Sequence, residues 1–460
     1  MKRLFYLCAL LLVHVCIYAQ QAKYVFFFIG DGMGVNQVNV TEMYRAAVQG
    51  RIGVERLTFG DFPAAGIATS YSASNPITDS AAGGTALATG TKTYNGAIGV
   101  DADKQPLQSI AQRAKASGKK VAILTTVGIN HATPAAFYGH QPKRSMYDEI
   151  ARELPASGFD FFAGAGILRS KKKDVPSLEP VIEEGGYAIA HGMDEYASKS
   201  ADANKILLIQ KEETNDGSLP YAIDRKESDM TLAQMTESAI SFLMKEKNKG
   251  FFLMAEGGKI DWACHNNDLG TAVNEIIDFD NAVKVAYEFY KKHPKETLIV
   301  ISADHETGGL GMGTSGYKMN LKALECQRVS QEELSRRITT LRKDKDVTWE
   351  QVKALLSETM GFWDELPLTW SQERALRDKF EKSFVQHKTV FTETLYARSE
   401  SLAAAAIEVM SRIARLGWTT GSHSAEYVPV YAIGAEAELF MGKMDNTDIP
   451  KRIAKAGGYK

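Results

Sequence analysis

The sequence predicts a doubly wound α/β fold, in which a mostly parallel central sheet carries helices on both faces, with an added helical insertion. Two observations lead to this prediction. Short continuous apolar runs recur along the chain and end at glycines or polar residues, and amphipathic segments of helical period separate them. Continuous apolar runs are typical of parallel strands buried on both faces, and strands that alternate with helices indicate such a sheet.

The expected strands and helices follow in chain order. The first apolar run is Lys23 to Ile29, which ends in the turn Gly30-Asp31-Gly32-Met33-Gly34. The later runs are 121–125, 251–255, 297–302 and 428–433. Helical patterns lie between them, for example at 106–117 and 231–248. The chain therefore alternates between strands and helices.

Residues 311–417 depart from this alternation and read as amphipathic helices. Ser330 and Glu333 predict a capping box, and further helices are expected at 348–359 and 399–416. We interpret this stretch as an insertion within a single domain that covers residues 20–460. No low-complexity linker flanks it, so we expect it to pack on the main domain.

The composition limits the classes of function. Lys and Arg total 54 against 56 Asp and Glu, which leaves a formal charge of -2 and no general attraction to nucleic acid or to membranes. Any recognition of anions must be local. No apolar run after residue 19 reaches the roughly 18 residues of a membrane helix, so we expect no membrane span.

Residues 1–19 have the pattern of a secretory signal peptide, since Lys2 and Arg3 precede an apolar stretch that ends near Ala19. We expect cleavage there and export to the periplasm or the medium. The mature chain then keeps two thiols, Cys264 and Cys326. The sequence leaves open whether these two thiols form a disulfide.

Ser80 lies where a helix is expected to begin, with Thr78 or Asp79 as the N-cap and a run of small residues behind it. The N–H groups at a helix start favour anions, so a phosphoryl group could bind beside this hydroxyl. The alternative is an ordinary cap in a packed helix. Because no Gly-x-Ser-x-Gly motif surrounds Ser80, a nucleophilic serine here needs another activator, and a metal ion is the obvious candidate.

Potential metal ligands follow four of the expected strands: Asp31, Thr133, Glu256, and the pair Asp304 and His305. Ligands of open α/β sheets gather outside the carboxyl ends of the strands, so these side chains are expected to converge. Asp261 and His265 are four residues apart and share a face if their segment is helical. Taken singly, each residue has an ordinary alternative as a cap or a surface charge.

The types of ligand indicate the metals. Imidazoles combined with carboxylates suit zinc, whereas the oxygen set of Asp31, Thr133 and Glu256 suits magnesium. Cys264 is a poor candidate for a zinc ligand, since the other thiol is far away in sequence.

These motifs, taken in order, resemble the alkaline phosphatase family. The resemblance covers the mature chain except the insertion, and it rests on six motifs: Asp31-Gly-Met-Gly, Asp79-Ser80-Ala, His131-Ala-Thr133-Pro, Glu256-Gly-Gly-Lys-Ile-Asp261 with His265, Ala303-Asp304-His305, and Gly421-Ser422-His423. It implies that the protein hydrolyses phosphate monoesters, of broad range, at two Zn²⁺ and one Mg²⁺, with a phosphoserine intermediate. A homodimer is a further, weaker expectation.

The resemblance also implies a role for each residue. One zinc would be bound by Asp261, His265 and His423, and the other by Asp31, Asp304 and His305 with Ser80 as its catalytic ligand. Magnesium would be bound by Asp31, Thr133 and Glu256. Arg144 matches the phosphate-binding arginine of the family, and its forked guanidinium suits two phosphoryl oxygens.

Two positions depart from the best-known bacterial form of the family, which has Asp and Lys where this chain has His131 and Trp262. Similar choices occur in other bacterial members. We expect the reaction class to be retained, while these two residues bear on phosphate binding and on magnesium affinity.

The sequence bears differently on three alternative functions. A sulfatase needs a Cys/Ser-x-Pro-x-Arg motif, which Ser80-Ala81-Ala82 lacks. A phosphodiesterase of the same superfamily is harder to exclude. An exported protein that binds phosphate or metal without catalysis is disfavoured by the presence of both Ser80 and Arg144.

Overall fold

The structure is a computed structural model that describes residues 21–169, 177–212, 217–246, 248–314, 316–344, 346–388, 390–393 and 398–460. The expected signal peptide at 1–19 lies outside the described residues. Among the described helices, none combines the length and the apolar character that a bilayer crossing requires. Cys264 and Cys326 are both free thiols, so the disulfide that the sequence left open is not formed.

A ten-stranded sheet forms the centre of the main domain, and within it β15 alone runs antiparallel to its neighbours. This arrangement confirms the predicted fold class. Across the sheet the strands are β16 (Gly442–Asp445), β2 (Ala64–Thr69), β15 (Val428–Gly434), β8 (Thr297–Ser302), β1 (Tyr24–Gly30), β7 (Phe251–Gly257), β3 (Lys120–Thr125), β4 (Phe161–Gly164), β6 (Ile206–Ile209) and β5 (Ala188–His191).

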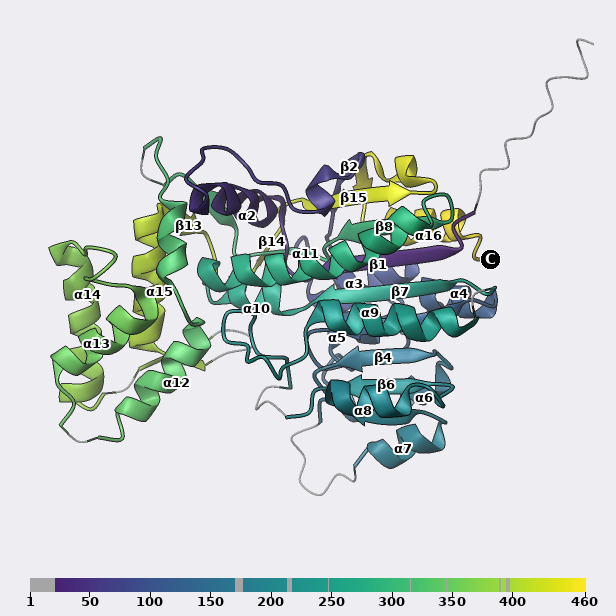
Figure 1. Cartoon of the computed structure of the whole chain (residues 1–460), viewed down its shortest axis with the longest axis horizontal. Coiled ribbons are helices and arrows are strands. Elements are labelled where there is room, and N and C mark those ends of the chain that lie inside the picture. Colours follow the sequence, from purple (N-terminus) through teal and green to yellow (C-terminus); the bar gives the residue numbers. More distant parts are fainter. Residues whose placement is uncertain are drawn as a thin grey trace, which may run out of the picture.

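Helices cover both faces of the sheet (Figure 1). On one face α9 (Leu232–Leu243) packs against α11 (Leu269–Lys292), and on the other α3 (Ser80–Thr89), α4 (Ile110–Ala116), α5 (Ala132–Ala135) and α16 (Asp448–Gly457) pack together. The remaining helices of the main domain are α2 (Val35–Val48), α6 (Tyr147–Ala156), α7 (Glu179–Glu184), α8 (Gly192–Lys199) and α10 (Lys259–His265), with short turns η1 (Phe59–Asp61), η2 (Met244–Glu246) and η5 (Ala437–Phe440).

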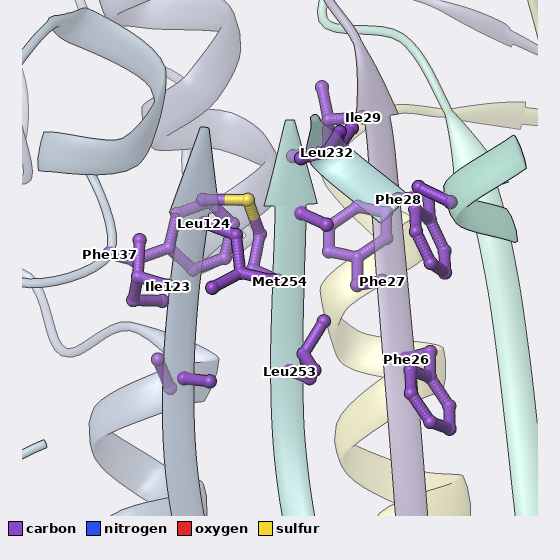
Figure 2. Packing of buried hydrophobic residues seen from close by; sticks show 14 of the residues in the cluster. Phe26, Phe27, Phe28, Ile29, Ile123, Leu124, Phe137, Leu232, Leu253 and Met254 are labelled. Atoms are coloured by element: carbon purple, nitrogen blue, oxygen red, sulfur yellow. The ribbon is translucent and has the colours of Figure 1, made fainter. Parts of the chain in front are cut away.

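The core is densest around β1, whose side chains are all buried. Successive side chains of a strand point to opposite faces of the sheet. Phe26 and Phe28 therefore stack on one side of β1 with ring centroids 6.4 Å apart, and Phe27 meets Phe137 on the other (Figure 2). Both faces of this strand are apolar, which is why its sequence reads as a continuous hydrophobic run.

The insertion forms a second apolar cluster beside the carboxyl ends of the parallel strands (Figure 1). The cluster includes Val40 of α2 and Leu269 of α11, so the insertion packs directly on the main domain. Its elements are β10 (Leu310–Met312), η3 (Leu321–Cys326), α12 (Gln331–Leu341), α13 (Trp349–Met360), α14 (Trp370–Phe380), η4 (Glu381–Val385), β11 (Phe391–Glu393), β12 (Arg398–Glu400), α15 (Ser401–Ala414) and β13 (Leu416–Trp418).

Two local expectations were wrong. Ser330 accepts a hydrogen bond from the Glu333 N–H, but the Glu333 carboxylate binds Arg336 and Arg337 instead of completing a capping box. The helix expected at 231–248 ends at Leu243 and continues as the turn η2.

Candidate active site

The polar strand ends converge because β8, β1, β7 and β3 are consecutive neighbours in the sheet. Ile29 pairs with Ser302 on one side and with Glu256 on the other, and Glu256 in turn pairs with Thr125. Asp31 and Asp304 each lie two residues beyond paired positions. The loop after β3 leads to α5, which carries Thr133.

Ser80 is the first residue of α3, and Asp79 is its N-cap. Asp79 Oδ1 accepts from the N–H groups of Ala82 and Gly96, both at 3.0 Å. The small residues of this helix have a structural reason: a Cβ on Gly83 would lie 2.9 Å from the Asp304 carbonyl oxygen. This close approach brings Ser80 Oγ to 3.2 Å from His305 Nε2.

Two sets of donor atoms are close enough to share a metal ion. We call Asp31, Asp304 and His305 the serine cluster and Asp261, His305 and His423 the histidine cluster; within each, one donor atom per residue lies within 4.8 Å of the others. The serine cluster has the same protein ligands as one of the zinc sets that the family resemblance implied. The histidine cluster has His305 where the other set had His265.

His265 nevertheless lies beside the histidine cluster. Its Nε2 is 3.1 Å from His423 Nε2 and 3.4 Å from Asp261 Oδ2. The helical spacing of Asp261 and His265 on α10 therefore gives the shared face that the sequence indicated.

Backbone carbonyls orient these imidazoles. His265 Nδ1 donates to the Gly421 oxygen at 2.7 Å, and His423 Nδ1 donates to the Thr78 oxygen at 2.8 Å. A proton held on Nδ1 leaves Nε2 as a lone-pair donor, which is the form that binds a metal. Sequence reasoning named Gly421 and Thr78 but missed the role of their carbonyl oxygens, because a backbone carbonyl carries no side-chain signal. It also missed Thr307, whose hydroxyl donates to Asp261.

The site buries four carboxyl groups, those of Asp31, Glu256, Asp261 and Asp304, each of them fully covered. Burial, together with neighbouring carboxylates, raises the pKa of Asp31 and of Asp304 well above the ordinary range, and burial raises the pKa of Glu256 to about 7. Burial also opposes ionisation of Asp261, but His265 and the other nearby histidines outweigh it and hold the pKa of this carboxyl below its usual value.

Several carboxylate oxygens also lack hydrogen-bond donors. Within the described part of the chain, neither oxygen of Asp31 accepts a hydrogen bond, although His305 Nε2 is 3.3 Å from Oδ1; Glu256 Oε1 and Asp261 Oδ2 are likewise unsatisfied. Buried polar atoms are otherwise nearly always paired, so bound cations fit these donors.

The third predicted set is also brought together. Glu256 is close enough to Asp31 to raise the pKa of that carboxyl. Thr133 Oγ1 donates to Asp304 Oδ2 at 3.3 Å, and Thr125 donates to Glu256. Hard oxygen donors of this kind suit magnesium.

Arg144 contacts Asp79, the residue before Ser80, and His131. Its Nη1 is 3.2 Å from Asp79 Oδ2, and its Nη2 is 3.2 Å from His131 Nε2. Burial and the nearby guanidinium lower the pKa of His131 to about 3, so this imidazole is neutral. Trp262 meets His131 edge to face, with ring centroids 6.0 Å apart.

A buried lysine stands behind Trp262. Lys259 is 2% exposed, and its Nζ lies 4.5 Å from the centre of the Trp262 ring and 3.7 Å from that of Tyr221. Nζ also donates to Ser218 Oγ at 2.8 Å. The sequence gives no sign of this burial, since a lysine is ordinarily a surface residue.

The fold and the site define the class of protein as a metal-dependent α/β hydrolase with a serine at its centre. Comparison with known proteins specifies this class further. A family model described as alkaline phosphatase matches residues 22–171 and 212–459. The chain therefore belongs to the alkaline phosphatase family, and it is an enzyme that hydrolyses phosphate monoesters.

Individual relatives agree. Alkaline phosphatase 3 of Bacillus subtilis is 33% identical over 448 residues, which cover 95% of this chain and 90% of the relative. Alkaline phosphatase 4 of the same organism is 36% identical over 386 residues, covering 82% and 76%. Among solved structures, the cold-active alkaline phosphatase of a psychrophilic Shewanella superposes with a TM-score of 0.80 at 31% identity, over 94% of this chain and 99% of the other.

Proposed function

We propose that the enzyme forms a covalent phosphoserine on Ser80 at a site that holds two zinc ions and one magnesium ion. The observation that carries this proposal is the 3.2 Å separation between Ser80 Oγ and His305 Nε2. It places a hydroxyl at a helix N-terminus against a buried group of carboxylates and neutral imidazole. A serine hydroxyl is a weak nucleophile at its ordinary pKa, and this surrounding offers an activator.

The proposed ligands are those that the family resemblance implied; they match the serine cluster, and in the other set His265 takes the place that His305 has in the histidine cluster. Asp31, Asp304, His305 and Ser80 would hold one zinc, Asp261, His265 and His423 the other, and Asp31, Thr133 and Glu256 the magnesium. The unsatisfied oxygens of Asp31, Glu256 and Asp261 support this assignment. When bound, these ions supply Lewis acidity, which lowers the pKa of a coordinated hydroxyl and stabilises negative charge on phosphoryl and leaving oxygens.

Solved structures of a distant relative support the proposed magnesium site. Alkaline phosphatase of the Antarctic bacterium TAB5 is 26% identical to this chain with a TM-score of 0.68, over 96% of this chain and 99% of the other. Variants of it with glutamate or aspartate in place of a histidine have magnesium bound in a site called M3. By analogy, we propose a magnesium site here whose affinity depends on the nearby neutral His131.

The chain's own residues then account for the reaction. Ser80 Oγ loses its proton to solvent and attacks phosphorus, the ester P–O bond breaks, and the alcohol leaves with a proton from water. A water molecule next attacks the phosphoserine, the P–Oγ bond breaks, and Ser80 and inorganic phosphate are released. Arg144 binds two equatorial oxygens throughout, while the N-terminus of α3 favours their negative charge.

We also propose a substrate range, a location, a domain organisation and an oligomeric state for the enzyme. A site that contacts mainly the phosphoryl group suits a broad range of monoesters. The pattern of residues 1–19 supports export to the periplasm or the medium. We infer one catalytic domain over 20–460 with the insertion at 311–417, and a homodimer remains a prediction.

A substrate panel tests the proposal. Zinc- and magnesium-loaded protein is assayed with an aryl phosphate monoester, the matching diester and the matching sulfate, beside Ser80→Ala. The monoester should be by far the best substrate, and Ser80→Ala should lower kcat by at least about a thousandfold. A preference for the diester would favour a phosphodiesterase, and tight phosphate binding without turnover would favour a binding protein.

A further inference from the structure

A large cleft lies between the insertion and the histidine cluster. Its volume is about 790 Å³. The main domain contributes His265, Gly421 and Ser422 to its lining, and the insertion contributes residues of α15 and β13. It therefore begins at a predicted metal ligand and extends toward the helices that the rest of the catalytic site does not use.

The cleft touches the candidate site at His265, and Ser80 is not among its lining residues. Successive contacts lead from Ser80 Oγ to His305 at 3.2 Å, from His305 to the stacked ring of His423 with centroids 3.6 Å apart, and from His423 to His265 at 3.1 Å. In an in-line displacement the leaving oxygen departs opposite to the attacking atom. If Ser80 attacks as proposed above, the alcohol portion of the substrate points toward His265 and this cleft.

One face of α15 forms the outer wall. Ala404, Glu408, Ser411 and Arg412 line the cleft at intervals of three and four residues, together with Ile407. Glu408 and Arg412 are exposed, whereas the opposite face of the helix is buried in the apolar cluster of the insertion. The wall is thus a rigid helix face and not a loose loop.

The inner wall is equally fixed. β13 pairs antiparallel with β10, with Leu310 opposite Trp418. The Trp418 ring packs so closely on Gly308 that a Cβ on that glycine would lie 2.4 Å from the ring. The cleft therefore has a mixed lining, in which Trp418, Leu416 and Ile407 lie beside polar side chains that include Asn266, Asn267 and Gln331.

We propose that this cleft is the subsite for the leaving group and that it binds ring-bearing alcohols of nucleoside size. Ligand pockets of about 300–1,000 Å³ typically hold molecules of that size. Here the lining combines one aromatic residue, Trp418, with the amide-bearing side chains of Asn266 and Gln331, a combination that suits a ring with polar substituents. A small polyol such as glycerol fills only a small part of a cleft of this volume, so we expect it to gain little from Trp418 and α15. The insertion thus sets the preference among monoesters, and this inference rests on the proposed direction of attack.

Substitutions that fill the cleft with a large side chain test this proposal. Ala404→Trp places a large ring on the half-buried wall position, and Glu408→Trp does the same at an exposed position one turn along the helix. Arg377→Trp on α14 is the matched control, since Arg377 is exposed and does not line the cleft. For a nucleoside 5′-monophosphate, KM should rise about tenfold in both cleft variants through steric exclusion. For glycerol 2-phosphate, and for inhibition by inorganic phosphate, both should match the control.

A second measurement does not require turnover. Adenosine alone is titrated into wild-type and variant protein by calorimetry, and the cleft variants should bind it at least about tenfold more weakly than wild type and control. The proposed subsite would be wrong if the cleft variants changed KM equally for the nucleoside 5′-monophosphate and for glycerol 2-phosphate. It would also be wrong if these variants bound adenosine as tightly as wild type. If wild type hydrolysed neither ester, the proposed function would fail, while adenosine binding would still decide the subsite.

Discussion

Arg144 is anchored by the residue that caps the helix of Ser80: its Nη1 lies 3.2 Å from Asp79 Oδ2. The two oxygens of Asp79 have different partners: Oδ2 binds Arg144, whereas Oδ1 accepts hydrogen bonds from the N–H groups of Ala82 and Gly96. One carboxylate therefore positions both the guanidinium that we propose to bind phosphate and the helix whose first residue is the proposed nucleophile.

The first prediction separates these two functions. Asp79→Asn keeps an Oδ1 acceptor for the helix cap but removes the charge that holds Arg144. A partly exposed ion pair contributes about 0.2–1 kcal/mol, so the inhibition constant for inorganic phosphate should rise by about two- to fivefold while the melting temperature changes little. Asp79→Ala, which also removes the cap, should in addition lower the melting temperature. Phosphate inhibition unchanged in Asp79→Asn would show that the anchor does not matter.

The second prediction concerns Trp262. In family members with lysine at this position an ammonium lies near the phosphate, so Trp262→Lys, preferably with His131→Asp, should strengthen inhibition by phosphate and lower kcat. The structure also predicts that Trp262→Lys lowers the stability of the protein, because Lys259 Nζ lies 4.5 Å from the centre of the Trp262 ring. Two neighbouring ammonium groups repel, and the variant should lose about 1–3 kcal/mol of stability.

Lys259→Met provides the control for that cost. In protein that already carries Lys259→Met, Trp262→Lys should cost less stability than in wild type. The effect of Trp262→Lys on the phosphate inhibition constant should be the same in both. If Trp262→Lys only lowers the melting temperature and leaves phosphate inhibition where it was, Trp262 is a packing residue and our account of its role is wrong.

The third prediction uses a buried carboxyl outside the catalytic site. Burial, assisted by Asp278, raises the pKa of Glu275 to about 7, and Glu275 Oε1 accepts from the Ala222 N–H at 2.6 Å. Because the folded-state pKa lies above the unfolded value of about 4.3, this group lowers stability progressively as the pH rises from about 4 to 7, and the loss stays constant above that range.

Glu275→Gln keeps the acceptor and cannot ionise. It should therefore be more stable than wild type by about 1–3 kcal/mol at pH 8.5, with the advantage lost at pH 5. Urea unfolding at both pH values measures this difference. An equal effect at both pH values would contradict ionisation of Glu275 as the cause.

The fourth prediction tests whether the carboxylate clusters are built for cations. Asp31 has two buried oxygens without hydrogen-bond donors among the described residues. In chelator-treated protein, Asp31→Asn should raise stability by about 1–3 kcal/mol, since it removes the cost of burying a carboxyl group that is ionised in the unfolded chain and whose pKa burial raises. In zinc- and magnesium-loaded protein the same substitution should lower stability. Thermal unfolding under both conditions checks the change of sign, and a stabilising effect under both would argue against metal binding there.

The sequence predicted the strands of the catalytic edge well, because β1, β3, β7 and β8 are continuous apolar runs whose ends carry polar residues. It did not predict that these strands are adjacent in the sheet, which depends on how the helices cross over. Four-residue strands such as β5 gave too short a signal to be found.

The candidate site, too, could be predicted from the sequence only in part. Side-chain chemistry and motif order indicated Ser80 and the carboxylates, whereas the carbonyls of Thr78 and Gly421 and the lysine behind Trp262 became visible only through tertiary contacts. The pairing of Ser330 with Glu333 failed as a capping box because nearby arginines compete for the carboxylate.

The central claim is the covalent phosphoserine on Ser80, and rapid acid quenching tests it most directly. Metal-loaded enzyme is mixed with a ³²P-labelled monoester, quenched in acid during turnover, digested and analysed by mass spectrometry. The account predicts one labelled peptide with phosphate on Ser80, and no label in Ser80→Ala. Label on a histidine, or the absence of any covalent species at acid pH while the enzyme turns over, would contradict it.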